Sequence, residues 1–588
     1  MAMWQGTELN ETTHLWKMYE EGIDYQIKSG LRFNIPKYID FFEGRQWPLP
    51  TENTKNLPRP VVNIVKMICR SKKSSILSTP VKILYKSYMK NKDTDKLNSF
   101  AESILKELNQ EGLDRLAIDD GIKKGSYFFH YYWDKNAQGL SGRTEGGVRC
   151  EIIDPLNIFF QNPSELDEQK QGWILISTPL ELEKIKSLAD EGCNLSALAP
   201  DKSDGHLTSE EASSNGSTYG KNQQSQGTAT LLTRYFKVDG EVWCERCTKY
   251  SQIQKPFRLT PDKEALKQLI YKDSLQINKN EEKEVSKTKK CGYLETLVSK
   301  NTPKASLYPV VCGYYERKEG SIYGISEVEG LIPNQKAINF NIAMTLLNSQ
   351  QCAWGKYVAL PNALKGQTVT NSPGQVLIDY SGTGNGIKRM KDEGVSEIPM
   401  SIVQAITELT KTASGTNEIL SSESLNTNLS GVAIAQLQAQ AEVPIEELRA
   451  TFWEAKKKQG LVLAQFIRLY YYDKEFIRKT RDEQGRECEI CDRFHSQDYE
   501  DCIFDVVVEA TKGSRSAIAS DVSLLDSCLK NGSISFETYI KAYPEGALSN
   551  KTSILNQINK EKEEEIYKLR KELEKYKKSK MVDPVSII

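Results

Sequence analysis

The segment Tyr323-Gly324-Ile325-Ser326-Glu327 opens a long helical pattern that carries no charge between Lys336 and Lys356. A serine beside an acidic first turn is typical of a helix start. Apolar residues then recur mostly at helical spacing, at Val328, Leu331, Ile338, Ile342 and Leu346. The other faces carry amides, among them Asn334, Gln335, Asn339 and Asn341. Because a lone surface helix normally has a charged outer face, the sequence predicts that a helix over 324–350 packs between neighbours or lines a passage. An internal helix of a large enzyme domain is the alternative.

Short turns and a second helix follow this segment. Tyr357–Leu360 and the glycine-rich run Gly382–Gly386 predict a small β-unit with tight turns within residues 351–399. Helical spacing returns over 400–413, and residues 414–430 then form a Ser/Thr/Asn/Glu segment without Lys or Arg. A much longer helix is expected from Gly431, with kinks at Pro444 and Gly460. The order predicts a helical hairpin with a β-tip that projects from a body.

Composition limits the possible classes of protein. The chain has 588 residues, is 39% hydrophobic and 27% charged, and has a net charge of -1. This balance argues against a generally basic nucleic-acid binder. No apolar run reaches the length needed to cross a bilayer, so no membrane partner is expected. The polar start lacks a signal-peptide core, which favours a reducing cytoplasm, and the twelve cysteines are expected to be free thiols.

The remaining segments predict a mixed α and β body. Helices are expected over 8–46 and 94–123. Strands are expected at 80–85 and 502–508, at 125–133 with its partner 148–153, and at 231–236 and 241–243 joined by a turn at Asp239-Gly240. Residues 196–228 and 278–290 have little to bury and are predicted to be flexible surface insertions. A last helix is expected over 554–580.

Five pieces of the chain, taken in order, resemble the portal (head–tail connector) proteins of tailed bacteriophages, in the podovirus-like branch. They are Phe42-Glu43-Gly44-Arg45-Gln46-Trp47 with Arg59, Pro60 and Asn63; Asp119-Asp120-Gly121 to Gly125; Asp154-Pro155-Leu156-Asn157-Ile158-Phe159 with Asn162-Pro163; Tyr323-Gly324-Ile325-Ser326 with Gln335 and Asn339; and Asn428-Leu429-Ser430-Gly431-Val432-Ala433. No single piece is specific, but five in this order over about 400 residues are fairly specific.

The resemblance implies an α+β portal-type fold that assembles into a ring, expected to be a dodecamer, around a channel for double-stranded DNA. Residues 1–323 and 431–510 would form the wing, and 324–350 and 400–413 the two stem helices. Residues 351–399 would form the clip, 414–430 the tunnel loop and 511–588 a helical crown. The implied partners are the terminase motor, the major capsid and scaffolding proteins, and the head–tail adaptor or tail. The protein would be assembled in the host cytoplasm and reside at the portal vertex of the virion.

Two sets of residues are the candidate contacts for these partners. The clip residues expected to contact the motor and later the adaptor are Lys365, Asp379, Lys388, Arg389 and Lys391. The tunnel-loop residues expected to face the channel are Glu418, Ser421, Ser422, Glu423, Asn426 and Asn428. A pore that passes DNA in both directions should not hold it tightly, because each cation paired with a phosphate adds salt-dependent affinity. A neutral stem helix and an acidic tunnel loop suit such a surface.

The sequence gives weaker support to a metal site, a phosphate-binding loop or a catalytic site. Cys244 and Cys247, with Cys488 and Cys491, have the spacing of zinc ligands, but free buried thiols are favoured over a metal site. The run Gly382–Gly386 lacks the spacing of a phosphate-binding loop. Asp119 and Asp120 are interpreted as a solvated helix end rather than a two-metal site. The chain is therefore expected not to be an enzyme and to need no cofactor. A nuclease or ATPase of the packaging apparatus, or another head–tail adaptor, remains the alternative.

Overall fold

The computed structural model is α+β and divides into two compact units. The first unit comprises Met1–Leu77, Ile83–Ser424 and Ala441–Glu509, and the second comprises Ser78–Lys82, Leu425–Gln440 and Ala510–Ile588. The structure describes residues 8–87, 94–137, 146–190, 193, 195–201, 227–259, 304–353, 357–370, 375–382, 385–389, 397–415, 431–471, 473–481, 487–495, 499, 504–510, 515–543, 554, 557–558 and 566–573. The predicted insertions lie mainly outside these ranges.

A five-stranded antiparallel sheet, in the order β4-β5-β6-β7-β8, forms one layer of the first unit. Its strands are β4 (Ile158–Phe160), β5 (Trp173–Glu181), β6 (Thr228–Val238), β7 (Glu241–Cys247) and β8 (Gln252–Arg258). The predicted turn between β6 and β7 is confirmed. Asp239 and Gly240 have φ values of 52° and 77°, the left-handed pair that a two-residue hairpin turn of the right twist requires.

A three-stranded sheet, in the order β3-β2-β9, forms the second layer. Its strands are β2 (Ser126–Asp134), β3 (Gly147–Ile153) and β9 (Val310–Tyr314). The predicted pairing of the aromatic strand with residues 148–153 is confirmed, because β2 and β3 are antiparallel with Phe128 opposite Ile153. The pairing of β2 with β9, about 180 residues along the chain, has no local signal in the sequence.

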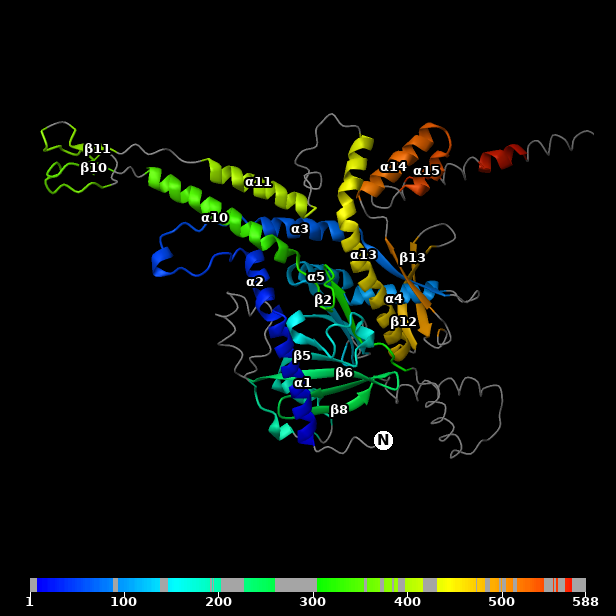
Figure 1. Ribbon diagram of the computed structural model, residues 1–588. Helices are drawn as coiled ribbons and strands as arrows, with labels where there is room; N and C mark the ends of the chain where they lie inside the picture. Colours follow the sequence, from blue (N-terminus) through cyan, green and yellow to red (C-terminus); the bar gives the residue numbers. More distant parts are fainter. Residues whose placement is uncertain are drawn as a thin grey trace, which may run out of the picture. The chain divides into compact units, whose positions relative to one another are not determined.

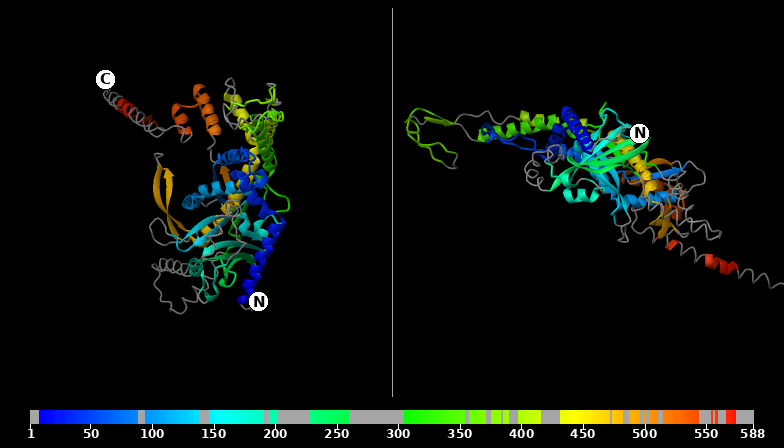
Figure 2. Two further views of the ribbon diagram at one scale, coloured as in Figure 1. Left: turned by 90° about the vertical axis from the view of Figure 1, so that its left-hand side faces the viewer. Right: turned by 90° about the horizontal axis from the view of Figure 1, so that it is seen from below.

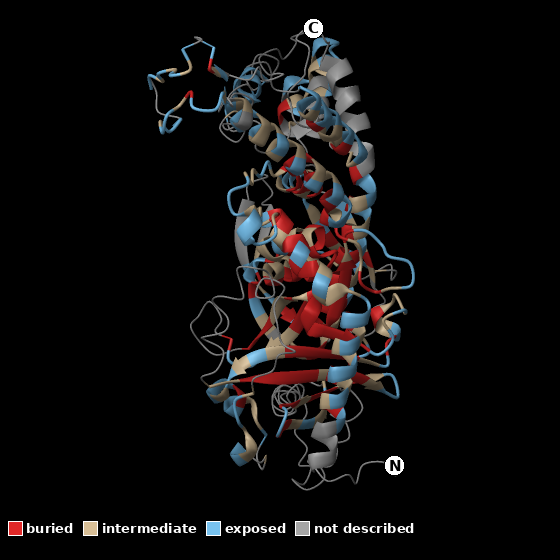
Figure 3. Ribbon diagram, turned by 60° about the vertical axis from the view of Figure 1, so that its left-hand side comes forward, coloured by how far each residue is buried: buried red, intermediate tan, exposed pale blue. Residues whose placement is uncertain are grey.

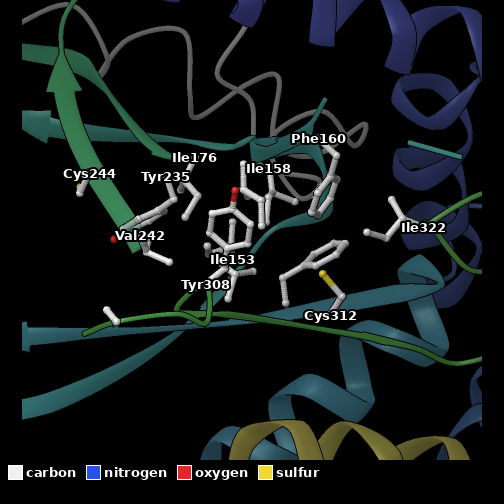
Figure 4. Packing of buried hydrophobic residues seen from close by; sticks show 14 of the residues in the cluster. Ile153, Ile158, Phe160, Ile176, Tyr235, Val242, Cys244, Tyr308, Cys312 and Ile322 are labelled. Atoms are coloured by element: carbon white, nitrogen blue, oxygen red, sulfur yellow. The ribbon is translucent and has the colours of Figure 1, made fainter. Parts of the chain in front are cut away.

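The main core lies between these two sheets (Figure 4). Figure 4 shows Tyr235 and Val242 of the larger sheet converging on Tyr308 and Cys312, which come from the chain that leads into and along β9. Tyr323 belongs to the same cluster, and its hydroxyl donates to the Ile158 carbonyl oxygen at 2.8 Å. The residue at which the helical pattern begins is therefore itself a core residue of the body.

Helices surround the two sheets (Figure 1). They include α1 (Glu8–Lys28), α2 (Leu31–Glu43), α3 (Ile64–Leu77), α4 (Asp95–Glu107), α5 (Gln110–Lys124) and the short α6 (Leu182–Leu188). The helix predicted over 8–46 is interrupted, because Gly30 adopts φ 79° between α1 and α2. The helix predicted over 94–123 is likewise two helices, with Asn109 at φ 50° between them. Helix α1 packs on the five-stranded sheet, where Tyr19 meets Phe159 edge to face at 5.3 Å.

The predicted helical hairpin is confirmed. Helix α10 (Glu327–Ala353) leads to the two-stranded ribbon of β10 (Tyr357–Ala359) and β11 (Ile387–Arg389), and α11 (Ile398–Ala413) returns beside α10. Figures 1 and 2 both show this hairpin extending away from the sheets, with the ribbon at its far end. Helix α10 starts and ends three residues later than the predicted 324–350.

Helix α13 (Gly431–Tyr470) begins at the predicted residue. From Ala441 onward it belongs to the first unit, together with β12 (Asp473–Arg481), β13 (Glu487–His495) and most of the pair β1 (Val81–Ser87) and β14 (Phe504–Ala510). The predicted strands near residues 80–85 and 502–508 are thereby confirmed. The hairpin of β12 and β13 is fixed to α4 by aromatic packing, in which Phe100 stacks on Phe494 at 4.2 Å. The kinks at Pro444 and Gly460 stay predictions.

The second unit contains α14 (Arg515–Lys530) and α15 (Phe536–Ala542). The two helices contact each other, and the Tyr539 hydroxyl donates to Asp526 at 2.5 Å. Of the predicted final helix, residues 554, 557–558 and 566–573 are helical, and the rest lies outside the described residues. Among the described helices, none is long and apolar enough to cross a membrane.

Candidate functional site

The start of α10 is fixed to the body by close backbone packing. A Cβ atom on Gly324 would lie 2.5 Å from the Gly125 carbonyl oxygen, so only glycine fits there. Next to it, the Ser326 hydroxyl lies 2.9 and 2.8 Å from the Ile122 and Lys123 carbonyl oxygens and accepts from the Val328 N–H at 3.1 Å. The first turn of α10 is therefore tied to the junction of α5 and β2.

Ion pairs stabilise the same junction. Glu327 pairs with Lys72 of α3 at 2.7 Å and accepts from the Tyr315 hydroxyl at 2.9 Å. On α5, Asp119 pairs with Lys73 at 2.9 Å and Lys123 at 2.6 Å. Burial alone would raise the pKa of Asp119, but hydrogen bonds from the two lysines outweigh it and lower that pKa.

The second acid, Asp120, pairs with Lys124 at 3.0 Å, and Lys124 also pairs with Asp154 at 3.1 Å. The interpretation of Asp119 and Asp120 as a solvated helix end is therefore wrong. Both carboxylates are partly buried and neutralised by lysines of α3 and α5, because the fold packs this end of α5 under the start of α10.

The four predicted stem amides fall into two kinds. Gln335 and Asn339 are buried and form a hydrogen-bonded chain within the subunit. The Gln335 amide oxygen accepts from Ile64 N–H at 3.0 Å and its amide nitrogen donates to Asn339 at 2.9 Å. Asn339 in turn donates to Gln46 at 2.6 Å. These two side chains connect α10 to the start of α3 and to Gln46, which follows α2, and both are buried within the subunit.

The other two amides are half-buried. Asn334 donates to the Thr410 hydroxyl at 3.0 Å and so connects α10 to α11. Asn341 donates to the Ala337 carbonyl oxygen of its own helix at 2.8 Å. Only Asn334 contributes a side-chain bond between the two helices of the hairpin at these positions.

Large apolar side chains remain exposed on the outer part of the hairpin. Phe340 and Met344, four residues apart, are exposed on α10, with Phe340 59% exposed. On α11, Ile398, Ile402 and Leu409 lie at helical spacing, and Leu409 is 69% exposed. Figure 3 shows burial concentrated in the sheets and much exposed surface on the hairpin. A single chain thus leaves large apolar side chains exposed on both helices of the hairpin.

At the hairpin tip, the predicted clip residues have different roles. Asp379 accepts from the N–H groups of Ser381 and Gly386, both at 2.8 Å, and hydrogen bonds from Ser381 and Gly386 lower its pKa. Lys365 lies over the Tyr380 ring at 5.0 Å. Asp379 therefore shapes a turn, and Lys365 packs within the tip.

The basic residues of the ribbon stay candidates for contact with a partner. Lys388 is exposed on β11, opposite Val358. Arg389 lies on the same strand, opposite Tyr357. Lys391 lies outside the described residues.

All six predicted channel-facing residues of the tunnel loop lie outside the described residues: Glu418, Ser421, Ser422, Glu423, Asn426 and Asn428. Of the predicted loop, the structure describes only residues 414 and 415.

The alternative metal site receives no support from the described cysteines. Cys244 belongs to the core between the sheets, whereas Cys247 packs against α1 and Phe159 in a separate cluster. Residues three apart on a strand point to opposite faces, so the two thiols of this pair do not converge. Burial raises the pKa of Cys244 to about 11 and also raises that of Cys247. Cys491 is exposed, and the side chain of Cys488 is outside the described set.

Two features of the body had no clear signal in the sequence. Lys456 on α13 is buried and pairs with Asp114 on α5, while its ammonium group also donates to Gln459 at 3.1 Å. The segment between α2 and α3 is a braced loop in which Arg59 donates to the Pro48 carbonyl oxygen at 2.7 Å. Its four prolines were the only indication that it would be ordered.

A projecting two-helix hairpin with a small β-tip, on a mixed α and β body, is the architecture expected of a phage portal subunit. The family model of the phage P22-like portal protein matches residues 17–517, and the chain belongs to that family. The match covers the body, the hairpin and α13 and ends within α14. No curated protein gives a significant match. The chain is thus a phage portal protein, a structural component of the virion at the head–tail connection rather than a member of an enzyme family.

Proposed function

We propose that the chain forms a closed ring, a dodecamer, whose central channel conducts double-stranded DNA during packaging and ejection. In this assignment α10 and α11 are the stem, residues 351–399 the clip, 414–430 the tunnel loop and 511–588 the crown. The two sheets with the surrounding helices and α13 are the wing. The clip would dock the terminase motor and later the head–tail adaptor, while the wing and crown would face the capsid and scaffolding proteins.

One observation carries the ring assignment: the hairpin exposes large apolar side chains on both of its helices. Phe340 and Met344 lie on α10, and Ile402 and Leu409 lie on α11. A cyclic ring is built from head-to-tail contacts in which two different surfaces of each subunit meet. The α10 side of one hairpin would cover the α11 side of the next. This arrangement supplies the neighbour that a neutral helix of this length requires.

The mass of the purified assembly tests the ring. We expect closed rings of uniform mass by mass photometry and negative-stain imaging. The substitution Phe340→Asp should weaken assembly, because the aspartate would place a charge in the contact between hairpins. Gln350→Asp, at an exposed polar position on the same helix, is the matched control and should assemble normally. A monodisperse monomer of about 67 kDa over a wide range of concentration and salt would refute the proposal.

A further inference from the structure

The loop between α2 and α3, residues 48–62, projects from the body on the side of α10 (Figure 1). We call it the arm. Both helices that flank it, α2 and α3, contact α10. In Figure 2 the arm and α10 again extend in the same direction. Its length is well above that of an ordinary connection between helices, and ordered loops of this length usually have a function.

The arm is held rigidly by its own polar groups. Arg59 reaches across it to the Pro48 carbonyl oxygen at 2.7 Å and to the Thr54 hydroxyl at 3.1 Å. The Trp47 indole N–H donates to the Pro60 carbonyl oxygen at 2.9 Å and closes its base. Thr51 and Thr54 cap a short 3-10 turn at its tip. A loop fixed before binding loses little conformational freedom when a partner docks.

The arm's apolar side chains point outward. Leu49 is 88% exposed, and Leu57 and Val62 are also exposed. Glu52, Lys55 and Arg59 are its only charged residues, and Arg59 is engaged within the arm. A largely apolar, preorganised surface whose two exposed charges, Glu52 and Lys55, have opposite signs suits an apolar protein surface better than phosphate groups.

A second copy of this chain supplies such a surface. The arm lies on the side of the hairpin that α10 forms. In a head-to-tail ring, that side meets the α11 side of the next subunit. There Ile398, Ile402 and Leu409 form an exposed apolar stripe. We propose that the arm docks through Leu49 and Leu57 on the α11 stripe of the neighbouring subunit. The inference rests on the proposed ring.

Site-specific photocrosslinking tests this contact. A benzophenone amino acid at Leu49 should, on irradiation of the assembled full-length protein, produce dimers and longer ladders on denaturing gels. Mass spectrometry after trypsin digestion should join the arm to the peptide of residues 392–411, which contains the stripe. The same probe at Phe33, an apolar position on α2 that is 67% exposed, is the control and should not label that peptide.

Substitutions provide a second, independent measurement. Leu49→Ser with Leu57→Ser should raise the protein concentration at half assembly at least about tenfold, since each leucine loses its burial in the contact. Leu409→Ser should raise the concentration at half assembly by a similar factor. When it is combined with the arm variant, the loss of assembly free energy should be smaller than the sum of the losses of the two separate variants. Phe33→Ser should assemble like the natural protein.

The outcomes separate the arm from the ring. The arm contact would be overturned, and the ring left intact, if rings form normally but the probe at Leu49 does not label the peptide of residues 392–411 of a neighbour. Such a result includes crosslinks within one chain, crosslinks to other peptides and no crosslinks at all. Crosslinks only to an added capsid or scaffolding protein would also overturn it. Failure of the natural protein to form rings would overturn both proposals.

Discussion

At the scale of single residues, Gln335 shows how one side-chain amide of α10 can hold the start of α3. The first N–H groups of a helix have no partner within it, and the Gln335 amide oxygen accepts from Ile64 and Val65 at the start of α3. Its amide nitrogen donates to Asn339 and to the Val62 carbonyl oxygen. A buried side chain that satisfies several backbone groups cannot be replaced by an apolar one without leaving those groups unpaired.

Gln335→Leu should therefore lower the free energy of unfolding by about 1–3 kcal/mol. Asn341→Leu is the matched control, because Asn341 bonds only to its own helix, and it should change that free energy by no more than about 0.5 kcal/mol. Denaturant unfolding followed by tryptophan fluorescence measures both. Equal losses in the two variants would show that the amide chain contributes nothing specific.

We expect Asp379 to make the turn at the hairpin tip dependent on pH. Its pKa is lowered by hydrogen bonds from Ser381 and Gly386, so the ionised form stabilises the turn. A depressed folded pKa means that this stabilisation is complete above the ordinary value of 3.8 and is lost as pH falls through the folded value. Amide exchange at 379–386, corrected for its intrinsic pH dependence, should stay constant from pH 7 to about 5 and rise below about 4.

Asp379→Asn should increase exchange of the same turn at neutral pH, because a neutral amide is a weaker acceptor than a carboxylate. The backbone of α11 provides the reference segment, which should keep its exchange rate in both experiments. A turn whose exchange is unchanged in the variant would mean that Asp379 does not fix it.

At the scale of elements, Gly324 and Gly330 differ in the space available for a side chain: Gly324 lies at the closely packed base of α10, and Gly330 lies on its solvent-facing side. Gly324 has no room for a Cβ, since that atom would lie 2.5 Å from the Gly125 carbonyl oxygen and 2.6 Å from the Glu316 carbonyl oxygen. Gly330, one turn into α10, has open space where its Cβ would be. The same substitution therefore has opposite effects at positions six residues apart.

Gly324→Ala should destabilise the subunit by more than about 1 kcal/mol, because backbone and not a flexible side chain must move. Gly330→Ala should stabilise it by about 0.5–1 kcal/mol through helix propensity. Thermal unfolding of the two variants measures the difference. A Gly324→Ala variant as stable as the natural protein would contradict the close packing at the base of the hairpin.

The ribbon of β10 and β11 is the element we expect to bind the motor. Lys388 is exposed, and Arg389 follows it on the same strand. Reversing both charges, Lys388→Glu with Arg389→Glu, should leave the mass of the ring unchanged and weaken motor binding, because polar tips suit partners that dock and leave. Arg317→Glu with Lys318→Glu, two adjacent exposed residues of the body, is the control for charge alone. Undiminished retention of the motor by the double variant would remove the ribbon from the interface.

At the scale of the whole molecule, the proposed channel needs a surface that does not hold DNA. Glu418 and Glu423 are the only charged residues of the segment 414–430, and a ring of subunits would present them as circles of negative charge. Phosphate groups would be repelled from such circles. The neutral run of α10 between Lys336 and Lys356 fits the same requirement.

Glu418→Lys with Glu423→Lys should leave assembly intact and make the ring retain double-stranded DNA. Retention should fall steeply as salt rises, because each lysine that pairs with a phosphate releases counterions on binding. The measurement is DNA retention by purified rings over a salt series, with Glu418→Gln and Glu423→Gln as the neutral control. Packaging at the normal rate with no salt-dependent retention would mean that these residues do not face the channel.

Local signals in the sequence predicted most of the elements. The hairpin α10–α11, the start of α13 at Gly431, the pairing of β2 with β3 and the turn at Asp239-Gly240 all follow from spacing and turn chemistry. The helix boundaries were less accurate. Periodicity does not register a left-handed residue such as Asn109, so two pairs of helices were each predicted as one.

For the candidate sites too, some properties follow from the local sequence and others depend on tertiary contacts. The sequence by itself determined that the helix of the hairpin is uncharged after Lys336, that the hairpin tip is charged and turn-rich, and that residues 414–430 lack cations, because these are properties of composition along the chain. Only the tertiary structure decided that Gln335 and Asn339 are buried connectors, that Asp379 shapes a turn and that Cys244 and Cys247 lie in separate clusters. The reason is physical: Gln335 takes its role from Ile64, 271 residues away, and spacing along the chain does not encode such a partner. The partners of Asp379 are near in sequence, but only the folded turn brings their N–H groups to the carboxylate.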